Sequence, residues 1–306
     1  MSRRQGKCAA RRAPEPAARR SQSFAAAGWW LTVERSCDRK RRASLTSVKI
    51  ELMTPSTAEE LLQNALEIPF HGWDLSLLGD RLVLEPPPWS FERIVDDEAV
   101  RAGSMLDMGT GGGEWLSQRR HPARTVATES WPPNVPIAAA RLGPLGIAVV
   151  QDEGGVDNAD QATRQPHGRL AFREAAFDLV VNRHESFVAA EVRRTLRDGG
   201  VFVTQQAGSG ARQFHELLAL EPPPDDDFHI DLAVEQLERA GLRVEQSAVG
   251  TATTVFADIG ALAWYLSNVP WGVRDFSIER HRDSLLRLHG VPIRVASERF
   301  WIRAVV

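Results

Sequence analysis

Short apolar runs and amphipathic stretches alternate along the chain from residue 104 to residue 206. The short runs are typical of buried strands, and the stretches between them repeat apolar residues at helical spacing. We therefore predict an α/β fold built from βαβ units, with a parallel sheet and helices on both faces. The predicted strands are 104–108, 125–130, 147–151, 177–183 and 201–206, and the predicted helices are 113–120, 134–146 and 189–200.

Weaker patterns extend this core in both directions. Upstream, residues 54–67 show a helical face behind Ser and Thr caps, 69–91 are aromatic and turn-rich, and 91–103 read as a second helix. Downstream, residues 231–244 read as a helix followed by a strand, and 297–306 as a terminal strand. Two further helices are predicted at 258–271 and 277–290. We expect three segments: a basic extension (1–52), a helical and aromatic segment (53–103) and the main domain (104–306).

The first fifty residues differ from the rest in charge. They carry 13 Lys and Arg against three acidic residues, whereas the remainder has 24 basic and 37 acidic residues. The segment is Arg-, Ala- and Pro-rich without periodicity, which predicts disorder outside the fold. This reading includes a misassigned start, with Met53 as the true first residue, and the alternatives are a targeting segment and a binding tail. The acidic body counts against a broad nucleic-acid-binding surface, because phosphate binding needs a positive face.

Composition also bears on disulfides, metal sites, membrane spans and cellular location. Both cysteines, Cys8 and Cys37, fall in the basic extension, so the main domain has no thiolate metal site and no disulfide framework. No run of about 18 apolar residues is present, so a membrane span is not expected. We predict a cytoplasmic protein, and the oligomeric state stays open.

The sequence MLDMGTGGGEWL at 105–116 places four glycines within five residues after a predicted strand. Such turns let the backbone approach a ligand closely. A dinucleotide fingerprint needs Gly at i, i+2 and i+5, but Glu114 or Leu116 occupies the third position. A P-loop needs a Gly-Lys pair, and no Lys follows Lys49.

The remaining pattern, Asp107-x-Gly109-x-Gly111-x-Gly113, resembles the first motif of class I S-adenosylmethionine-dependent methyltransferases. The resemblance continues in order to residue 206 and includes FDLVVNR and LRDGGVFVTQQ. PFHGWD, TESWPPN and NRHESF also make the chain similar to an uncharacterised bacterial group of these enzymes. The resemblance implies a Rossmann-like, doubly wound, seven-stranded sheet whose last strand is antiparallel. It also implies that the inserted helices near 258–290 cap the substrate side.

The same resemblance implies a set of cofactor-binding residues. In this reading Asp107 holds the ammonium group of S-adenosylmethionine, and Glu129 binds the ribose hydroxyls. Asp152 is the candidate near the adenine amine, although Glu153 and Asp157 compete for that role. The full predicted cofactor set is Asp107, Gly109, Thr110, Gly111, Gly113, Glu129, Ser130, Trp131, Asp152, Asn182 and Arg183.

His184 is the candidate general base, since it follows the fourth strand and its ordinary pKa near 6.5 suits proton transfer. An orienting role for His184 is the alternative, and His71 is a second candidate. His281 and His289 are expected to be solvated on a surface helix. No His, Asp or Glu cluster has metal-ligand spacing, so no metal is predicted. Core packing is expected for Trp73, Trp89, Phe91, Trp264 and Trp271, with an aromatic acceptor pocket or cofactor cover as the alternative.

These features lead to one main functional hypothesis with two alternatives. The first is methyl transfer from S-adenosylmethionine to an O, N or C atom of a small molecule. The alternatives are an RNA methyltransferase and a catalytically silent S-adenosylmethionine-binding regulator. The sequence does not identify the methyl acceptor.

Overall fold

The computed structural model describes residues 57–152, 168–208, 210–221 and 228–306. The chain divides into two units, Met1–Met53 and Thr54–Val306, and every described residue belongs to the second unit. The predicted basic extension and the candidates Glu153 and Asp157 therefore lie outside the described residues.

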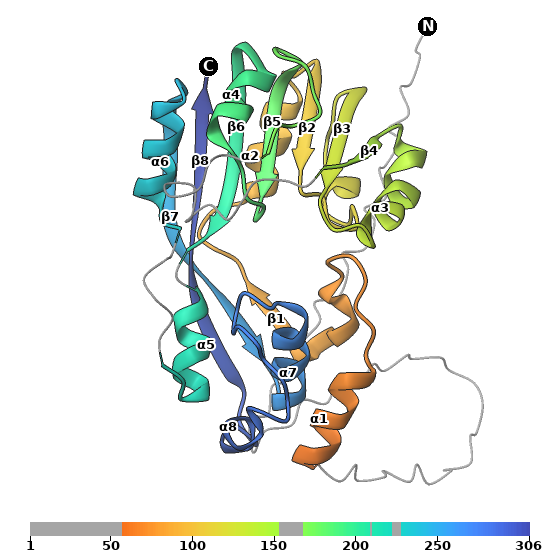
Figure 1. Cartoon of the computed structure of the whole chain (residues 1–306), viewed down its shortest axis with the longest axis vertical. Helices are drawn as coiled ribbons and strands as arrows, with labels where there is room; N and C mark the ends of the chain where they lie inside the picture. The colour runs from red at the N-terminus through yellow and green to blue at the C-terminus, as the bar shows by residue number, and fades with distance from the viewer. Residues whose placement is uncertain (1–56, 153–167, 209, 222–227) are drawn as a thin grey trace, which may run out of the picture. The chain divides into compact units, whose positions relative to one another are not determined.

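An eight-stranded sheet, in the order β1-β7-β8-β6-β5-β2-β3-β4, forms the frame of the second unit (Figure 1). Strands β2 to β6 run parallel to their neighbours within this set, while β8 is antiparallel to both β6 and β7. The strands are β1 (Leu82–Glu85), β2 (Ser104–Met108), β3 (Arg124–Glu129), β4 (Ala148–Gln151), β5 (Phe177–Arg183), β6 (Leu196–Ala207), β7 (Arg243–Phe256) and β8 (Ile293–Val305).

This topology confirms the predicted Rossmann-like fold with an antiparallel last strand. The predicted count of seven strands is wrong by one, because β1 pairs with the edge strand β7, with Leu82 opposite Phe256. The sequence LVLE of β1 lies between a turn and a run of prolines, where its four residues give too short a pattern to predict a strand.

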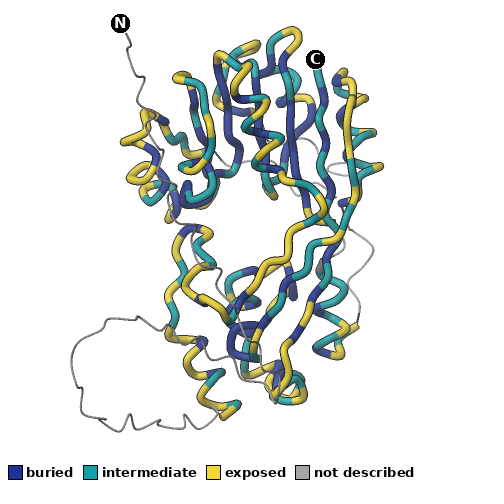
Figure 2. The backbone as a smooth tube through the Cα atoms, turned by 180° about the vertical axis from the view of Figure 1, so that it is seen from behind, coloured by how far each residue is buried: buried dark blue, intermediate teal, exposed yellow. Residues whose placement is uncertain are grey.

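Helices cover both faces of the parallel part of the sheet, as the alternation predicted. On one face, α4 and α6 pack on Leu106, Val180 and Phe202. On the other, α2 and α3 pack on Met105, Ala127 and Leu179. The buried strands between these helix layers are the dark tubes of Figure 2. The helices are α1 (Ala58–Glu67), α2 (Phe91–Ala99), α3 (Asn134–Leu142), α4 (Ala189–Thr195), α5 (Gly210–Leu218), α6 (Ile230–Arg239), α7 (Ile259–Asn268) and α8 (Arg282–Arg287), and the 3-10 helices are η1 (Leu75–Arg81), η2 (Leu116–Gln118) and η3 (Gly143–Leu145).

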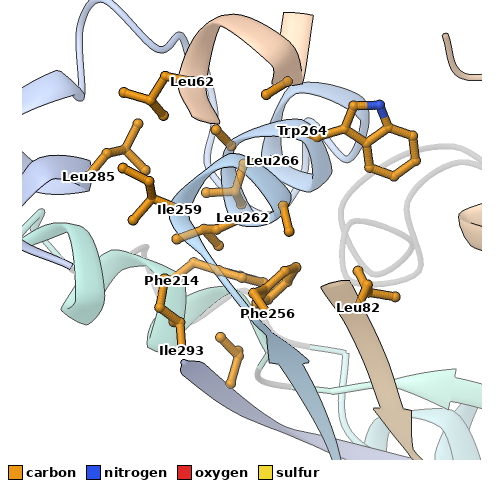
Figure 3. Close-up of a cluster of buried hydrophobic side chains, with 14 of the residues drawn as sticks. Leu62, Leu82, Phe214, Phe256, Ile259, Leu262, Trp264, Leu266, Leu285 and Ile293 are labelled. Carbon is orange, nitrogen blue, oxygen red and sulfur yellow. The ribbon is translucent and has the colours of Figure 1, made fainter. Parts of the chain in front are cut away.

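The long strands β7 and β8 continue past the parallel strands and support a second hydrophobic cluster. Helices α7 and α8 lie between these two strands in the sequence, and α1 packs against α7. Phe256, Ile259, Leu262 and Leu285 form the centre of this cluster (Figure 3), and Trp264 on α7 donates a hydrogen bond to the carbonyl of Ile68 at 3.0 Å. The inserted segment is thus attached to the sheet through a continuous apolar core.

Three helix predictions need correction. Residues 113–120 form only the 3-10 helix η2, because the left-handed Gly111 and Gly113 keep the preceding backbone out of helical geometry. The helix expected at 189–200 ends at Thr195, where β6 begins. The helix expected at 277–290 is reduced to the six residues of α8. Within the described ranges, no helix is both long and apolar enough to cross a bilayer.

Candidate functional site

The glycine-rich turn Gly109–Gly113 leaves the carboxyl end of β2 in the centre of the sheet. Gly109, Gly111 and Gly113 have φ values of 68°, 63° and 78°, a left-handed conformation that favours glycine. The Thr110 amide donates to the carbonyl of Thr128 at 2.8 Å, which ties the turn to the end of β3. The turn therefore has a fixed shape at the edge of the sheet where ligands bind in open α/β folds.

Glu129, at the end of β3, is held by the same turn. Its Oε2 accepts a hydrogen bond from the Gly111 amide at 2.7 Å, and its Oε1 accepts one from the Trp131 amide at 2.8 Å. Glu129 is buried, and burial raises the pKa of its carboxyl although these amides oppose the rise. The structure thus brings together two predicted cofactor residues that are 18 positions apart in the sequence.

Asp107 is the buried acid before the glycines. Burial raises the pKa of its carboxyl to about 7, against the effects of the Thr110 hydroxyl and of the nearby Arg183 guanidinium. The Thr110 hydroxyl lies near this carboxyl, and its buried Oγ1 makes no regular hydrogen bond to a described residue. A buried hydroxyl without a partner is costly and marks a place where a polar ligand fits.

Asn182 and Arg183, at the end of β5, point toward opposite faces of the sheet. The Asn182 Oδ1 accepts from Thr204 and from Gln206, while its buried Nδ2 has no partner among the described residues. The Arg183 guanidinium lies 5.2 Å from the ring centre of Trp115, a cation–π contact. Asn182 therefore has an unused donor, Nδ2, beside the glycine turn, whereas the Arg183 guanidinium already contacts Trp115.

Two further residues lie against the turn: Glu185, which the sequence prediction missed, and Trp73, for which it gave a cofactor cover as the alternative to core packing. A Cβ on Gly109 would lie 2.5 Å from Cβ and Cγ of Glu185, and a Cβ on Gly111 would lie 2.5 Å from Cδ1 of Trp73. Burial, with the negative charge of Glu129, raises the pKa of Glu185 to about 7. Glu185 follows the fourth strand closely and is the neighbour of the candidate base His184. This position was the signal that could have identified Glu185.

Three carboxyl groups thus surround one turn. Asp107, Glu129 and Glu185 form no ion pair among the residues described by the structure. Nor does any group of three or more His, Cys, Asp or Glu within those ranges have an arrangement that suits a metal ion. An organic cation with hydrogen-bonding groups is the ligand that this arrangement can stabilise best.

The other predicted cofactor residues lie at the ends of β3 and β4. Ser130 is half-buried and contributes its amide to the Glu129 carboxylate, and Trp131 is 62% exposed. The Asp152 amide donates to the Glu129 carbonyl at 3.2 Å, and Asp152 Oδ2 accepts from the Ala171 amide at 3.1 Å. Asp152 is therefore next to Glu129 through the backbone, while its side chain caps a neighbouring segment.

His184 lies on the other side of β5 from the turn, next to β6. Its amide donates to the Gln205 carbonyl at 2.8 Å, and its Nε2 lies 3.2 Å from the Gln205 amide nitrogen. The side chain is accessible to solvent, yet protein surrounds it closely. This enclosure, with the charges of Arg299 and Arg183, holds the pKa of His184 well below its ordinary value. The imidazole is therefore neutral at pH 7, and its Nε2 accepts from the Gln205 NH₂ group.

The backbone of His184 is strained, since its φ of 63° lies in the left-handed region. We expect His184→Gly to be more stable than His184→Ala by about 1 kcal/mol, because only glycine adopts this conformation without cost. Urea unfolding at pH 7 measures the difference. Ala175, with φ of 51°, offers the control, since Ala175→Gly should gain similarly over the wild type. Equal stability of the two His184 variants would contradict the strain.

The aromatic residues divide between core and surface. Phe91 and Trp264 are buried as expected, but Trp271 is 67% exposed, so its predicted core position is wrong. Trp73 lies 5.5 Å from Trp271 between ring centres, which places this exposed pair beside the glycine turn. His281, expected to be solvated, is instead buried and stacked on Phe276 at 5.1 Å, because α8 packs into the second hydrophobic cluster.

Comparisons with known proteins found likeness in structure and none in sequence. No protein-family model matches the chain, and no curated protein matches it. An S-adenosylmethionine-dependent methyltransferase from Aquifex aeolicus is 13% identical with a TM-score of 0.41, covering 82% of this chain and 99% of its own. Geranyl diphosphate methyltransferase in complex with S-adenosylmethionine is 13% identical with a TM-score of 0.42, covering 70% and 83%. An S-adenosylmethionine-dependent methyltransferase from Mesorhizobium loti is 13% identical with a TM-score of 0.40, covering 70% and 95%.

Such scores are too low to support an activity, and the strand order identifies the fold instead. From β4 to β7 the sheet runs β4-β3-β2-β5-β6-β8-β7, with β8 antiparallel between β6 and β7. This is the class I methyltransferase fold. In that fold the glycine turn follows the first strand of the parallel series, which is where Gly109–Gly113 lies.

Proposed function

We propose that the chain is a class I S-adenosylmethionine-dependent methyltransferase that transfers a methyl group to an O, N or C atom of a small molecule. The observation that supports it is the meeting of three unpaired carboxyl groups, those of Asp107, Glu129 and Glu185, at one glycine turn. Burial raises the pKa of two of these groups to about 7, even with the Arg183 guanidinium near Asp107. S-adenosylmethionine carries a sulfonium and an ammonium group, which these carboxyl groups would attract when ionised.

The residues at the turn fit the chemistry of this cofactor. In the proposal Asp107 binds the ammonium group, and Glu129 accepts hydrogen bonds from the ribose hydroxyls while it keeps its bonds to the turn. The unpartnered Thr110 hydroxyl and Asn182 amide supply further polar contacts. Trp131 is exposed beside Glu129 and is free to cover the adenine. Glu185 and Trp73, which now lie against the glycines, must shift to admit the cofactor.

The cofactor, when bound, would supply an activated methyl group, so the protein has mainly to orient the acceptor for in-line attack. His184 is the candidate to take a proton from the acceptor atom, because it follows β5 and reaches solvent. Its lowered pKa makes it a weak base, and its Nε2 must first leave the Gln205 NH₂ group to accept that proton. Gln205 holds the ring through its amide, and the Trp89 indole nitrogen in turn donates to Gln205 Oε1 at 2.9 Å. The chain Trp89–Gln205–His184 thereby fixes the ring.

Titration calorimetry with S-adenosylmethionine tests the proposal, with a dissociation constant in the micromolar range as the expected result. Formation of S-adenosylhomocysteine from a mixture of small-molecule extracts then separates an enzyme from a silent regulator. Binding without any turnover would favour the regulator, and no binding at all would exclude both. Salt-sensitive RNA binding that survives deletion of residues 1–50 would favour the RNA alternative.

Cofactor affinity should rise with pH in the slightly acidic range. Only ionised Asp107 attracts an ammonium group, and its pKa of about 7 leaves it mostly protonated at pH 5.5. The α-amino group of the cofactor stays charged over this range, as its ordinary pKa is about 7.7–8.0. We therefore expect affinity to increase about tenfold from pH 5.5 to pH 7, measured by calorimetry in buffers of matched ionic strength. A flat profile would show that Asp107 is ionised throughout or takes no part.

A further inference from the structure

Arg299, on β8, is a half-buried cation without an acidic partner among the described residues. It forms no ion pair with any described residue, and its one hydrogen bond there is from Nη1 to the Glu298 carbonyl at 2.9 Å. Burial lowers the pKa of its guanidinium, and among the described residues the Tyr265 hydroxyl opposes this. Other arginines on the same strand differ, since Arg294 pairs with Glu85 and Arg303 with Glu98. A half-buried guanidinium without an acidic partner can bind an anionic ligand.

The position of Arg299 relates it to the candidate base rather than to the cofactor turn. In the register of the sheet Arg299 lies opposite Ala207 of β6 and Gly250 of β7, and Gln205 lies two residues before Ala207 on the same face. Gln205 contacts His184, and the charge of Arg299 acts on the His184 imidazole. Arg299 and His184 therefore border one region at the carboxyl ends of β5 and β6.

Aromatic side chains flank the same region. A Cβ on Gly250 would lie 2.8 Å from Cζ3 of Trp89, so this indole covers the strand next to Arg299. Tyr265, on the inserted helix α7, has its ring centre 5.8 Å from that of Phe214 and 5.3 Å from that of Phe256. A flat or apolar molecule with one anionic group suits a region with aromatic side chains and one free guanidinium.

We propose that Arg299 binds an anionic group, a carboxylate or phosphate, of the methyl acceptor and so directs the acceptor atom toward His184. The acceptor is then a small anionic molecule, which narrows the substrate class of the proposed methyltransferase and rests on that proposal. The guanidinium offers two parallel N–H donors to such a group. Arg299 is in this account a specificity-determining residue, and His184 remains the proton acceptor.

Ligand-observed NMR titration of the full-length protein in its S-adenosylhomocysteine complex tests this assignment. The probes are benzoate, acetate and inorganic phosphate, with benzamide and acetamide as neutral counterparts. We expect benzoate to bind about tenfold more tightly than benzamide, the effect of one charged hydrogen-bonded contact. Arg299→Gln should remove the difference, and Arg299→Lys should retain part of it. Arg294→Gln, a change of an exposed arginine on the same strand, should leave both affinities unchanged.

Two results would overturn the inference. One is that none of the three anions binds the wild type more tightly than the neutral amides, which needs no variant and so does not depend on its folding. The other is that Arg299→Gln, folded by circular dichroism, binds benzoate as the wild type does. Calorimetry with S-adenosylmethionine on the same samples keeps the two proposals apart. Lost anion preference with intact cofactor binding rejects only the role of Arg299, whereas absent cofactor binding in the wild type rejects the proposed function.

Discussion

Asp107→Asn is expected to weaken S-adenosylmethionine binding at least about 100-fold while making the cofactor-free protein more stable at pH 8. The loss of binding follows from removal of the charge that would attract the ammonium group, since a charged hydrogen bond contributes about 1.5–3 kcal/mol and a buried partner left unpaired adds to the loss. The gain in stability follows from the cost of keeping a buried carboxylate ionised.

The sign of the stability effect depends on pH. The unfolded aspartate has a pKa near 3.9, whereas in the folded protein the pKa of Asp107 is about 7. The folded state therefore holds this proton more tightly, and the wild type loses stability as pH rises from about 4 through about 7. Asn carries no such penalty, so its advantage over the wild type should be about 2–3 kcal/mol larger at pH 8 than at pH 5. Urea unfolding at both pH values measures this change.

Asp178 provides the matched control, since it is an aspartate on the neighbouring strand β5 but at the opposite end of the sheet. It accepts from the Ser104 hydroxyl and the Arg197 guanidinium, each at 2.8 Å, and these bonds lower its pKa despite partial burial. Asp178→Asn should therefore reduce stability at pH 8 and leave cofactor affinity unchanged. A destabilised Asp107→Asn variant with wild-type cofactor affinity would reject the role given to Asp107.

The parallel core of the fold could be predicted because its pattern is local. Each strand from 104 to 206 is a short apolar run between turn residues, and each helix shows its own periodicity. Strand β1 could not be predicted in the same way, because its four residues form a strand only through pairing with β7. The helix expected at 113–120 failed for the opposite reason: its local pattern was helical, but the turn before it requires left-handed glycines.

The candidate site was predictable only where its residues follow strands directly. Asp107, Glu129 and Asn182 each lie at the carboxyl end of a predicted strand, so their convergence follows from a parallel sheet. Arg299 and Trp73 come from segments whose distance to the site depends on tertiary structure. Arg299 reaches the region of His184 through the antiparallel register of β8, and Trp73 reaches Gly111 from an irregular segment before η1. Neither relation leaves a periodic signal in the sequence.

Glu129→Gln is expected to weaken cofactor binding by at least about 100-fold and, unlike Asp107→Asn, to lower stability. Both carboxylate oxygens of Glu129 accept backbone amides, from Gly111 at 2.7 Å and from Trp131 at 2.8 Å. Glutamine keeps one acceptor oxygen and turns an NH₂ group toward the second amide, which then faces another donor. A buried amide left without an acceptor costs about 1–3 kcal/mol. We expect this cost to exceed the stability gained when one buried negative charge is removed.

Comparison of the two variants by urea unfolding at pH 8 makes the test sharp. Both remove one buried negative charge beside the same turn, so a purely electrostatic effect would shift stability in the same direction. Glu191→Gln is the control, because it removes an ion pair with Arg194 away from the turn and should leave cofactor affinity unchanged. If Glu129→Gln proved as stable as the wild type and still bound S-adenosylmethionine, Glu129 would neither hold the glycine turn nor bind the ribose. Opposite stability changes with loss of binding in both variants would show that Asp107 supplies charge to the site and Glu129 supplies its geometry.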